Sequence, residues 1–268
     1  MKPHWHIMKC REIIEVLERY YPRSAALGWD NVGLLIGSKE KEVQKIFVAL
    51  DVTDETLEEA VTAGADMIIT HHPMLFSAVK KITADDFIGR RIIRLIQKDI
   101  AYYAMHTNFD VKGMADLNAD ALDLRECTVL DETGVNEDGN SEGIGRAGVL
   151  EREMELSEFA AFVKRRFGLN GVLVYGETKE KISRAAVSGG SGKSMVQAAL
   201  AKGVQVLVTG DIDYHTAIDA TAQGLCIVDA GHYGTESMFI GYMKQRLGEL
   251  FPDIEVETAR IRQPFIIY

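Results

Sequence analysis

The sequence contains few cysteines, and their spacing is informative. Its three cysteines, Cys10, Cys127 and Cys226, lie far apart and form no CxxC pair. Neither a disulfide framework nor a thiolate zinc site is therefore expected. Cys226 lies within an apolar run, where a free cysteine most often acts as a small buried side chain.

The chain also lacks an excess of positive charge and a long apolar run. It has 30 lysines and arginines against 40 aspartates and glutamates, which gives a formal net charge of −10. Nucleic-acid-binding domains usually carry the opposite sign, so we expect no nucleic-acid partner. No run reaches the roughly eighteen apolar residues of a membrane-spanning helix, and no signal-peptide pattern follows the N-terminal residues. We therefore expect a cytoplasmic protein without a membrane partner.

What the sequence does contain is an alternation of strand and helix patterns. Its 268 residues are enough for one large or two medium α/β domains with a buried core. Apolar stretches at 46–50, 67–69 and 100–105 predict strands, and helical spacing over 87–98 predicts a helix between the last two. This alternation is typical of the α/β class.

The order of these elements occurs twice. The first copy begins with the strand at 46–50 and ends near His106, and the second begins at 185–187 and ends near His232. In both copies the middle strand ends at a threonine, Thr70 or Thr209. Such an internal repeat predicts two related α/β units.

The repeat predicts a division into an N-terminal α/β half, residues 1–126, and a C-terminal α/β half, residues 127–268. Residues 131–145 are rich in Gly, Glu, Asp and Asn, and we expect them to form a loop near the boundary. The apolar residues 264–268 predict a docked edge strand at the end of the chain.

Histidines and carboxylates gather at the carboxyl ends of the predicted strands, where α/β folds bind their ligands. The chain has seven histidines, and apart from His4 and His6 the other five follow a predicted strand or open the next helix. The candidate site residues are His71, His72, His106, Asp110, Asp211, His215, His232 and Glu236. Several imidazoles with several carboxylates suit two neighbouring first-row metal ions bridged by a carboxylate and a water. The sequence therefore predicts a divalent metal site.

The spacing of four of these residues sets geometric conditions. His232 and Glu236 are four residues apart, so they share one face if a helix begins at the preceding glycine. His71 and His72 are adjacent, and adjacent side chains of an extended chain point to opposite sides. Both can be ligands only if the chain turns there or if they serve two metals.

Two glycine-containing stretches leave alternatives open. Residues 188–194 resemble a P-loop, but Val187 occupies the position of its first glycine. The amides of this stretch could receive an anion, or its glycines could let the backbone approach another element. In the turn at 28–33 we expect Trp29 to anchor the core, and for Asp30 and Asn31 a turn role is favoured over a place in a pocket.

Six motifs along the whole chain resemble those of the Nif-three-like family, whose members are often labelled GTP cyclohydrolase 1 type 2 homologues. The motifs are Gly28–Gly33, Thr70–Pro73, His106–Asp110, Gly143–Arg146, Thr209–His215 and Gly231–Glu236. The resemblance implies two similar intertwined three-layer α/β/α domains with a dinuclear metal site between them. It also implies self-assembly into a ring-shaped homohexamer.

The resemblance further implies roles for individual residues. Its five metal ligands correspond to His71, His72, Asp110, His232 and Glu236, all of the matching type. His106 and His215 correspond to positions that either support the metal ligands or face the substrate, and an imidazole there would carry protons as a catalytic group. Nitrogen and oxygen ligands leave iron, zinc, manganese, cobalt and nickel open as the two ions.

Two functions follow from this resemblance. The first is a metal-dependent hydrolase that uses a metal-bridging water and acts on a small molecule, a nucleotide. The stretch Ser188–Ser194 and Lys193 would then contact the phosphates. The alternative is a non-catalytic metal-binding scaffold, carrier or regulator, ring-shaped and with a protein partner.

Overall fold

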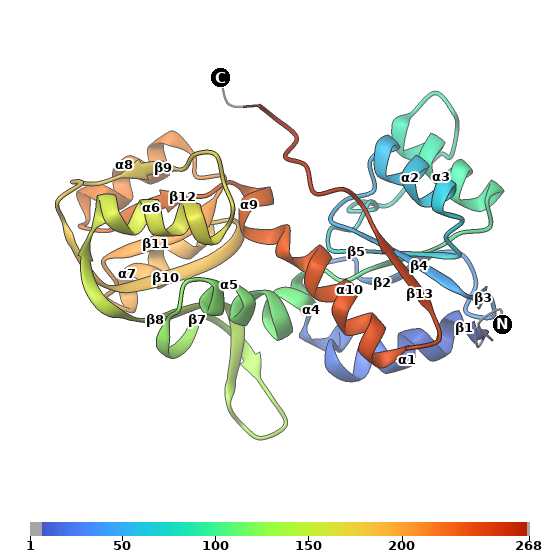
Figure 1. Cartoon of the computed structure of the whole chain (residues 1–268), viewed down its shortest axis with the longest axis horizontal. Coiled ribbons are helices and arrows are strands. Elements are labelled where there is room, and N and C mark those ends of the chain that lie inside the picture. Colours follow the sequence, from blue (N-terminus) through green and yellow to red (C-terminus); the bar gives the residue numbers. More distant parts are fainter. Residues whose placement is uncertain (1–6, 267–268) are drawn as a thin grey trace. The chain divides into compact units, whose positions relative to one another are not determined.

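The computed structural model describes residues 7–266, so His4, His6, Ile267 and Tyr268 lie outside the described residues. The chain forms two compact units (Figure 1). The first unit takes the described residues up to Phe109 together with Met238–Ile261. The second unit holds Asp110–Ser237 and the described residues from Arg262 onward.

The first unit is built on a five-stranded sheet in the order β13-β4-β5-β6-β2. Its strands are β2 (Gly33–Ile36), β4 (Lys45–Ala49), β5 (Met67–Thr70), β6 (Ala101–Ala104) and β13 (Glu255–Thr258). All neighbours are parallel except β2, which runs antiparallel to β6. A separate pair joins β1 (Met8–Lys9) to β3 (Glu42–Val43).

Helices cover both faces of this sheet (Figure 1). On one face lie α2 (Asp54–Ala63) and α3 (Phe87–Gln97), and on the other lie α1 (Cys10–Tyr20) and α10 (Met238–Leu250). Successive strand residues point to opposite faces. Phe47 and Ile68 thus pack with Leu95 of α3, while their neighbours in the strands are buried on the opposite side. The short helices η1 (Arg23–Ala25) and α4 (Thr107–Phe109) complete the unit.

The second unit is built on a six-stranded sheet in the order β7-β8-β10-β11-β12-β9. Its strands are β7 (Arg125–Val135), β8 (Ser141–Glu155), β9 (Leu173–Tyr175), β10 (Lys181–Ser191), β11 (Val206–Gly210) and β12 (Cys226–Asp229). The three strands β10, β11 and β12 are parallel, and the other pairings are antiparallel.

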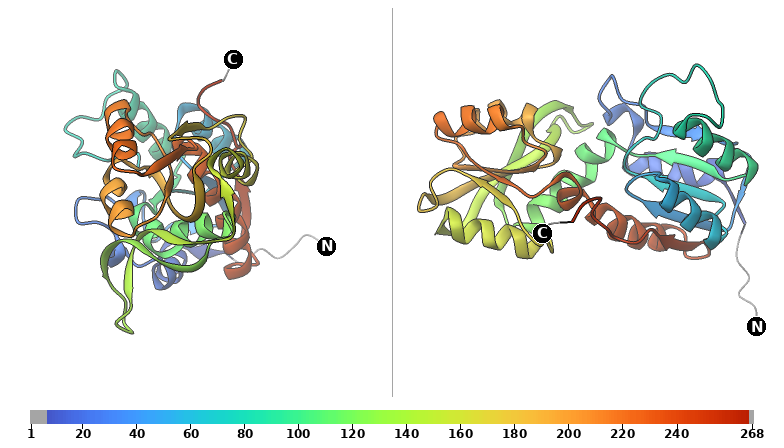
Figure 2. Two further views of the ribbon diagram at one scale, coloured as in Figure 1. Left: turned by 90° about the vertical axis from the view of Figure 1, so that its left-hand side faces the viewer. Right: turned by 90° about the horizontal axis from the view of Figure 1, so that it is seen from above.

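Helices again cover both faces (Figure 2). On one face are α5 (Ala115–Ala121) and α6 (Leu156–Arg166), and on the other are η3 (Lys193–Met195), α7 (Val196–Ala201) and α8 (Tyr214–Ala222). The remaining helical segments are η2 (Asp110–Met114) and α9 (His232–Glu236). In the described residues, no helix is both long and apolar enough to cross a membrane.

Both units share one connectivity. The order β4-α2-β5-α3-β6 of the first unit recurs as β10-α7-β11-α8-β12 in the second. In each, an antiparallel strand that precedes this run in sequence, β2 or β9, pairs beside the last parallel strand. The predicted α/β fold, two similar units with helices on both faces of a sheet, is confirmed.

The compact units do not divide the chain at residues 126 and 127. Helix α10 and strand β13 come from the C-terminal part of the sequence but belong to the first unit. Strand β13 pairs in parallel with β4, with Val256 opposite Ile46. This pairing satisfies the outer backbone groups of β4, which would otherwise form an exposed sheet edge.

Two expected segments differ from the structure. The loop expected at 131–145 is largely paired strand, because β7 and β8 form a long hairpin whose turn is confined to 136–140 (Figure 1). Its polar composition reflects strand surfaces exposed to solvent. The edge strand expected at 264–268 is wrong for the described residues 264–266, which form no strand. Phe265 and Ile266 are exposed, and β13 is the last strand in the described part of the sheet.

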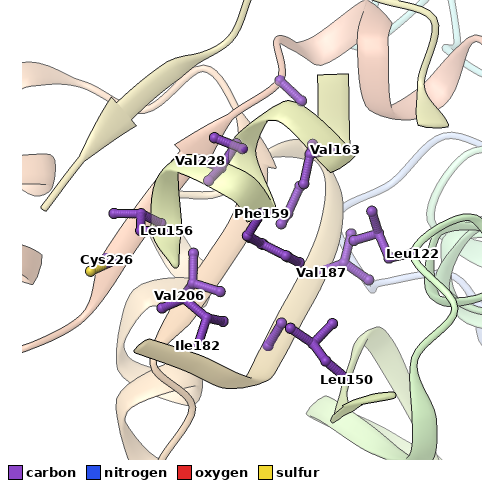
Figure 3. Packing of buried hydrophobic residues seen from close by; sticks show 14 of the residues in the cluster. Leu122, Leu150, Leu156, Phe159, Val163, Ile182, Val187, Val206, Cys226 and Val228 are labelled. Carbon is purple, nitrogen blue, oxygen red and sulfur yellow. The ribbon is translucent and has the colours of Figure 1, made fainter. Parts of the chain in front are cut away.

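The core of the second unit yields a stability prediction. Phe159 of α6 is fully buried and points toward the strands near Val187 and Val206 (Figure 3). We expect Phe159→Ala to lower the free energy of unfolding by about 3–5 kcal/mol, because it opens a cavity in a packed core. Phe162→Ala, at a partly buried neighbour on the same helix, should cost about 1 kcal/mol. Urea denaturation of the two variants would contradict this packing if their midpoints were equal.

Candidate metal centre

His71 and His72 follow β5 at a bend of the chain, and a hydrogen bond fixes each ring. The Nδ1 of His71 lies 2.8 Å from the carbonyl oxygen of Met105. The Nδ1 of His72 lies 2.9 Å from Oδ1 of Asp51. A carbonyl or an ionised carboxylate can only accept, so both Nδ1 atoms carry the proton. In a neutral ring the other nitrogen, Nε2, is then the one with a lone pair.

His106, the first histidine after β6, is held in the same way. Its Nδ1 lies 2.9 Å from Oδ1 of Asp30, whose side chain is fully buried. The other oxygen of Asp30 accepts from the backbone N–H of Thr107 at 2.9 Å. Burial raises the pKa of Asp30, but the hydrogen bonds from His106 and Thr107 outweigh it and lower that pKa to about 2. Asp30 is therefore an anion that orients His106.

These three histidines form the first donor set. One ring nitrogen from each lies within 4.8 Å of one ring nitrogen of the other two. The rings of His71 and His72 are 4.9 Å apart between centroids. The bend after Thr70 thus puts the side chains of His71 and His72 on the same side. A turn of the chain at this point is the first of the two arrangements in which both histidines could be ligands.

In the second unit, His232 opens α9 and Glu236 ends it. Their Nε2 and Oε2 atoms are 3.1 Å apart, a separation that two ligands of one metal ion also have. The Nδ1 of His232 lies 2.8 Å from Oδ2 of Asp211. The hydrogen bond to Glu236 raises the pKa of His232, burial lowers it, and the hydrogen bond to Asp211 raises it further. The result is a pKa of about 9. The negative potential of these two carboxylates, which stabilises the protonated ring, also favours a metal cation at Nε2 of His232.

Asp110 completes the second donor set with His232 and Glu236. It opens the π-helical segment η2, and π-helical turns often mark functional positions. One of its carboxylate oxygens lies within 4.8 Å of a carboxylate oxygen of Glu236. Within the second unit, Glu236 thus lies near both His232 and Asp110.

The glycine-rich end of β10 lies against Glu236. Gly190 has a φ of +65°, and a Cβ there would lie 2.5 Å from Oε1 of Glu236. Its N–H donates to Oγ1 of Thr235 at 3.0 Å. Lys193, the residue expected to contact phosphate, forms an exposed ion pair with Asp213 at 3.1 Å. Of the two alternatives for this stretch, the structure supports close approach of the backbone to another element.

His215 lies elsewhere. It is the second residue of α8 and is exposed, with its ring against that of Tyr214. It belongs to neither donor set, so its predicted role as a catalytic group stays a prediction.

Three aspartates that orient histidines had no such role in the sequence-based prediction. They are Asp30, Asp51 and Asp211. Asp51 and Asp211 come just after parallel strands, and that placement was the available signal. Asp211 also has a left-handed backbone, with φ at +51°, a strain that proteins concentrate at functional sites.

The expectation that Trp29 anchors the core is wrong. Its side chain is 64% exposed and contacts the ring of His106 edge-on at 5.9 Å between centroids. The neighbouring Asp30 is the buried residue of this turn, because its carboxylate satisfies the donors of His106 and Thr107. The anchor of the turn is thus a hydrogen-bonded anion and not an apolar ring.

The chemistry of both donor sets fits a divalent metal ion. The atoms offered are imidazole nitrogens and carboxylate oxygens, without sulfur, which suits the first-row ions from manganese to zinc. The rings are already oriented by aspartates or a backbone carbonyl, as is usual for histidine ligands of metals. The structure therefore contains a possible His/Glu metal site.

Two glycines with the same backbone conformation offer a matched test of the packing at Glu236. Gly190 and Gly203 have φ values of +65° and +63°, but a Cβ at Gly203 would meet nothing within 4 Å. Both alanine variants should incur about 1 kcal/mol for the left-handed backbone. Gly190→Ala should cost about 1 kcal/mol more, because the buried carboxylate of Glu236 has to move. Equal losses in urea denaturation would show that Glu236 is not held against this stretch.

Comparison with known proteins places this geometry in a family. A model of the Duf34/NIF3 (NGG1p interacting factor 3) family matches residues 8–264. A Clostridium perfringens protein named GTP cyclohydrolase 1 type 2 homolog is 36% identical over 262 residues, which cover 96% of this chain and 99% of that protein. A Streptococcus pneumoniae protein of the same name is 38% identical over 232 residues, covering 84% and 85%.

Solved structures agree. The crystal structure of a Bacillus cereus protein related to NIF3 superposes with a TM-score of 0.90 at 28% identity, covering 98% of this chain and 99% of that one. A Staphylococcus aureus protein described as hypothetical gives a TM-score of 0.89 at 31% identity, covering 98% and 100%. The resemblance carried by the six motifs is confirmed, and the chain belongs to the Duf34/NIF3 family.

Proposed function

We propose that this protein is a metal-dependent hydrolase that binds two divalent ions through His71, His72, Asp110, His232 and Glu236. The observation that supports this most is the hydrogen bonding of the histidines. In His71, His72 and His232 the Nδ1 atom bonds to a backbone carbonyl or a carboxylate. The same nitrogen, Nε2, is thereby directed to serve as the ligand in all three.

The work of the chain's own residues is to hold these atoms in place before any ion arrives. Each fixed ring has already lost the rotational freedom that binding would otherwise remove, which favours affinity. Asp51 and Asp211 also increase the basicity of the rings they contact, because a carboxylate at Nδ1 stabilises positive charge on the imidazole.

Bound divalent ions would polarise the bond to be cleaved and lower the pKa of a coordinated water. His106 would move a proton, since Asp30 holds its Nδ1–H and leaves Nε2 as the nitrogen that can take up or release one near His71 and His72. His215, exposed on α8, would exchange protons with solvent.

The substrate class of this proposal is a nucleotide. Its support is the name GTP cyclohydrolase 1 type 2 homolog carried by the similar Clostridium and Streptococcus proteins. With GTP as substrate, hydrolysis at carbon would open the five-membered ring of guanine and release formate. Formate and inorganic phosphate should both be assayed, after loading with Mn²⁺, Fe²⁺, Co²⁺, Ni²⁺ or Zn²⁺. If protein fully loaded with metal releases neither formate nor phosphate from any nucleotide, this substrate class is refuted.

Metal content tests the ligands independently of turnover. We expect about two ions per chain in protein purified without added metal. A His72→Ala, Glu236→Ala double variant should lose them, because it removes one ligand from each donor set. Elemental analysis should be accompanied by circular dichroism to show equal folding. Metal-free wild-type protein that cannot be loaded by dialysis would contradict the proposal.

The orienting aspartates should affect metal affinity without contacting the ion. We expect Asp51→Ala to weaken metal binding about 10-fold to 100-fold, because the ring of His72 loses its hydrogen-bond partner. Asp54→Ala is a matched control three residues away, at an exposed residue that pairs with Arg91. Competition with a fluorescent chelator gives both affinities, and equal affinities would show that Asp51 does not position His72.

One observation favours the alternative, a metal-binding scaffold, carrier or regulator. His71 and Glu236 are buried, with 0% and 3% of their surface exposed, and a closed ligand shell is typical of structural ions. This alternative predicts bound metal without turnover. The homohexamer implied by the family resemblance also stays a prediction, and sedimentation velocity would test it.

A further inference from the structure

Two exposed aromatic rings flank one histidine of the first donor set. Trp29 is 64% exposed and Phe76 is 57% exposed. Their rings meet that of His106 edge-on, at 5.9 Å with a 72° interplanar angle for Trp29 and at 5.6 Å with 89° for Phe76. A single exposed aromatic side chain is ordinary. Two that converge on the same imidazole form a local aromatic surface next to the donor atoms.

The turn that carries Trp29 is held rigidly. The carboxylate of Asp30 binds His106 and Thr107, and the N–H of Leu27 donates to Oγ1 of Thr107 at 2.9 Å. The backbone N–H of Asp30 donates to the carbonyl of Leu27 at 2.9 Å. Both sides of Trp29 are therefore tied to the segment that begins with His106, although the indole itself faces solvent.

The segment that carries Phe76 is tied to the same turn. The side-chain amide of Asn31 donates to the carbonyl oxygen of Leu75 at 2.6 Å. Phe76 lies in an irregular segment of sixteen residues between β5 and α3, residues 71–86. Irregular segments of this length are uncommon in compact domains, where they are usually either functional or linkers. The hydrogen bond links the two segments that carry the aromatic residues.

A rigidly held backbone combined with an exposed ring is typical of a residue that binds a ligand. An aromatic side chain that served only the fold would bury its apolar surface, whereas most of the Trp29 surface stays in water. Aromatic rings bind other planar rings by stacking, and preorganised ones lose little entropy when they do so.

We propose that Trp29 and Phe76 form a binding site for the planar heteroaromatic ring of a small-molecule substrate, beside His106. The inference deepens the proposed function by naming how its substrate is recognised. Stacking of this kind tolerates different ring systems, because every planar heterocycle offers a π face. The net charge of −10 disfavours nucleic acid as the source of the ring, so the ligand is a free small molecule.

The chain carries a built-in reporter for this site. Its only other tryptophan is Trp5, so a Trp5→Phe protein has Trp29 as its sole indole. Guanosine 5′-monophosphate should quench the fluorescence of Trp29 in a saturable way, because the base stacks on the ring. Ribose 5-phosphate, which has the same sugar and phosphate but no base, should not quench it. The titrations use metal-free protein kept in chelator.

Phe76→Ala in the same background should weaken the guanosine monophosphate affinity about tenfold, because one of the two rings is gone. Phe87→Ala is the control, since Phe87 is similarly exposed at 52% but packs against Arg91. It should leave the affinity unchanged. Equal quenching by the two phosphates, or an affinity that Phe76→Ala does not alter, would overturn the proposal.

This experiment separates the two proposals. Ring binding by metal-free protein does not depend on ligand atoms or turnover, so it can succeed even if no ion binds. Conversely, protein that binds two ions and hydrolyses a substrate but shows no ring-dependent quenching would retain the proposed function and lose the aromatic site.

Discussion

The hydrogen bond at Nδ1 is the interaction on which the candidate metal centre depends. His71, His72, His106 and His232 each place that nitrogen within 2.9 Å of a backbone carbonyl or a carboxylate. A histidine ring otherwise rotates and exchanges tautomers, and either change would direct the wrong nitrogen to the site. Fixing Nδ1 decides both the tautomer and the direction of Nε2.

The α/β fold itself brings the partners of these hydrogen bonds together. Parallel strands end together at one edge of a sheet, so residues just past neighbouring strands meet there. Asp51 follows β4 and meets His72, which follows the adjacent strand β5. In the second unit Asp211 follows β11 and meets His232, which follows β12. The same pairing thus occurs once in each unit.

The units differ in how closely the backbone approaches the site. In the second unit Gly190 brings the chain against Glu236, and a side chain there would overlap the carboxylate. In the first unit, the strand equivalent to β10 is β4, and Asp51 follows it instead of glycine. At this end of the strand one unit therefore has a carboxylate that orients a histidine, and the other has a glycine that leaves space for Glu236.

The sequence by itself determined the fold class and the chemical type of the candidate donor atoms. The strand and helix periodicities are local, and the clustering of histidines and acids after strands follows from chain order alone. It also showed the family through six motifs. The sequence-based prediction was wrong for the stretch 131–145, because a polar composition occurs both in loops and in solvent-exposed strands. The stretch is largely a hairpin, in which strand pairing satisfies the backbone hydrogen-bonding groups.

Only the tertiary structure decided which residues orient the donors and which stay exposed. Asp30 and His106 are 76 positions apart, and their contact depends on a turn meeting the end of β6. Trp29 looked like a core residue because large rings usually are, yet its neighbour provides the anchor and leaves the indole in solvent. Likewise α10 and β13 return to the first unit through a strand pairing with β4. Such contacts join distant segments, and no local pattern of residues encodes them.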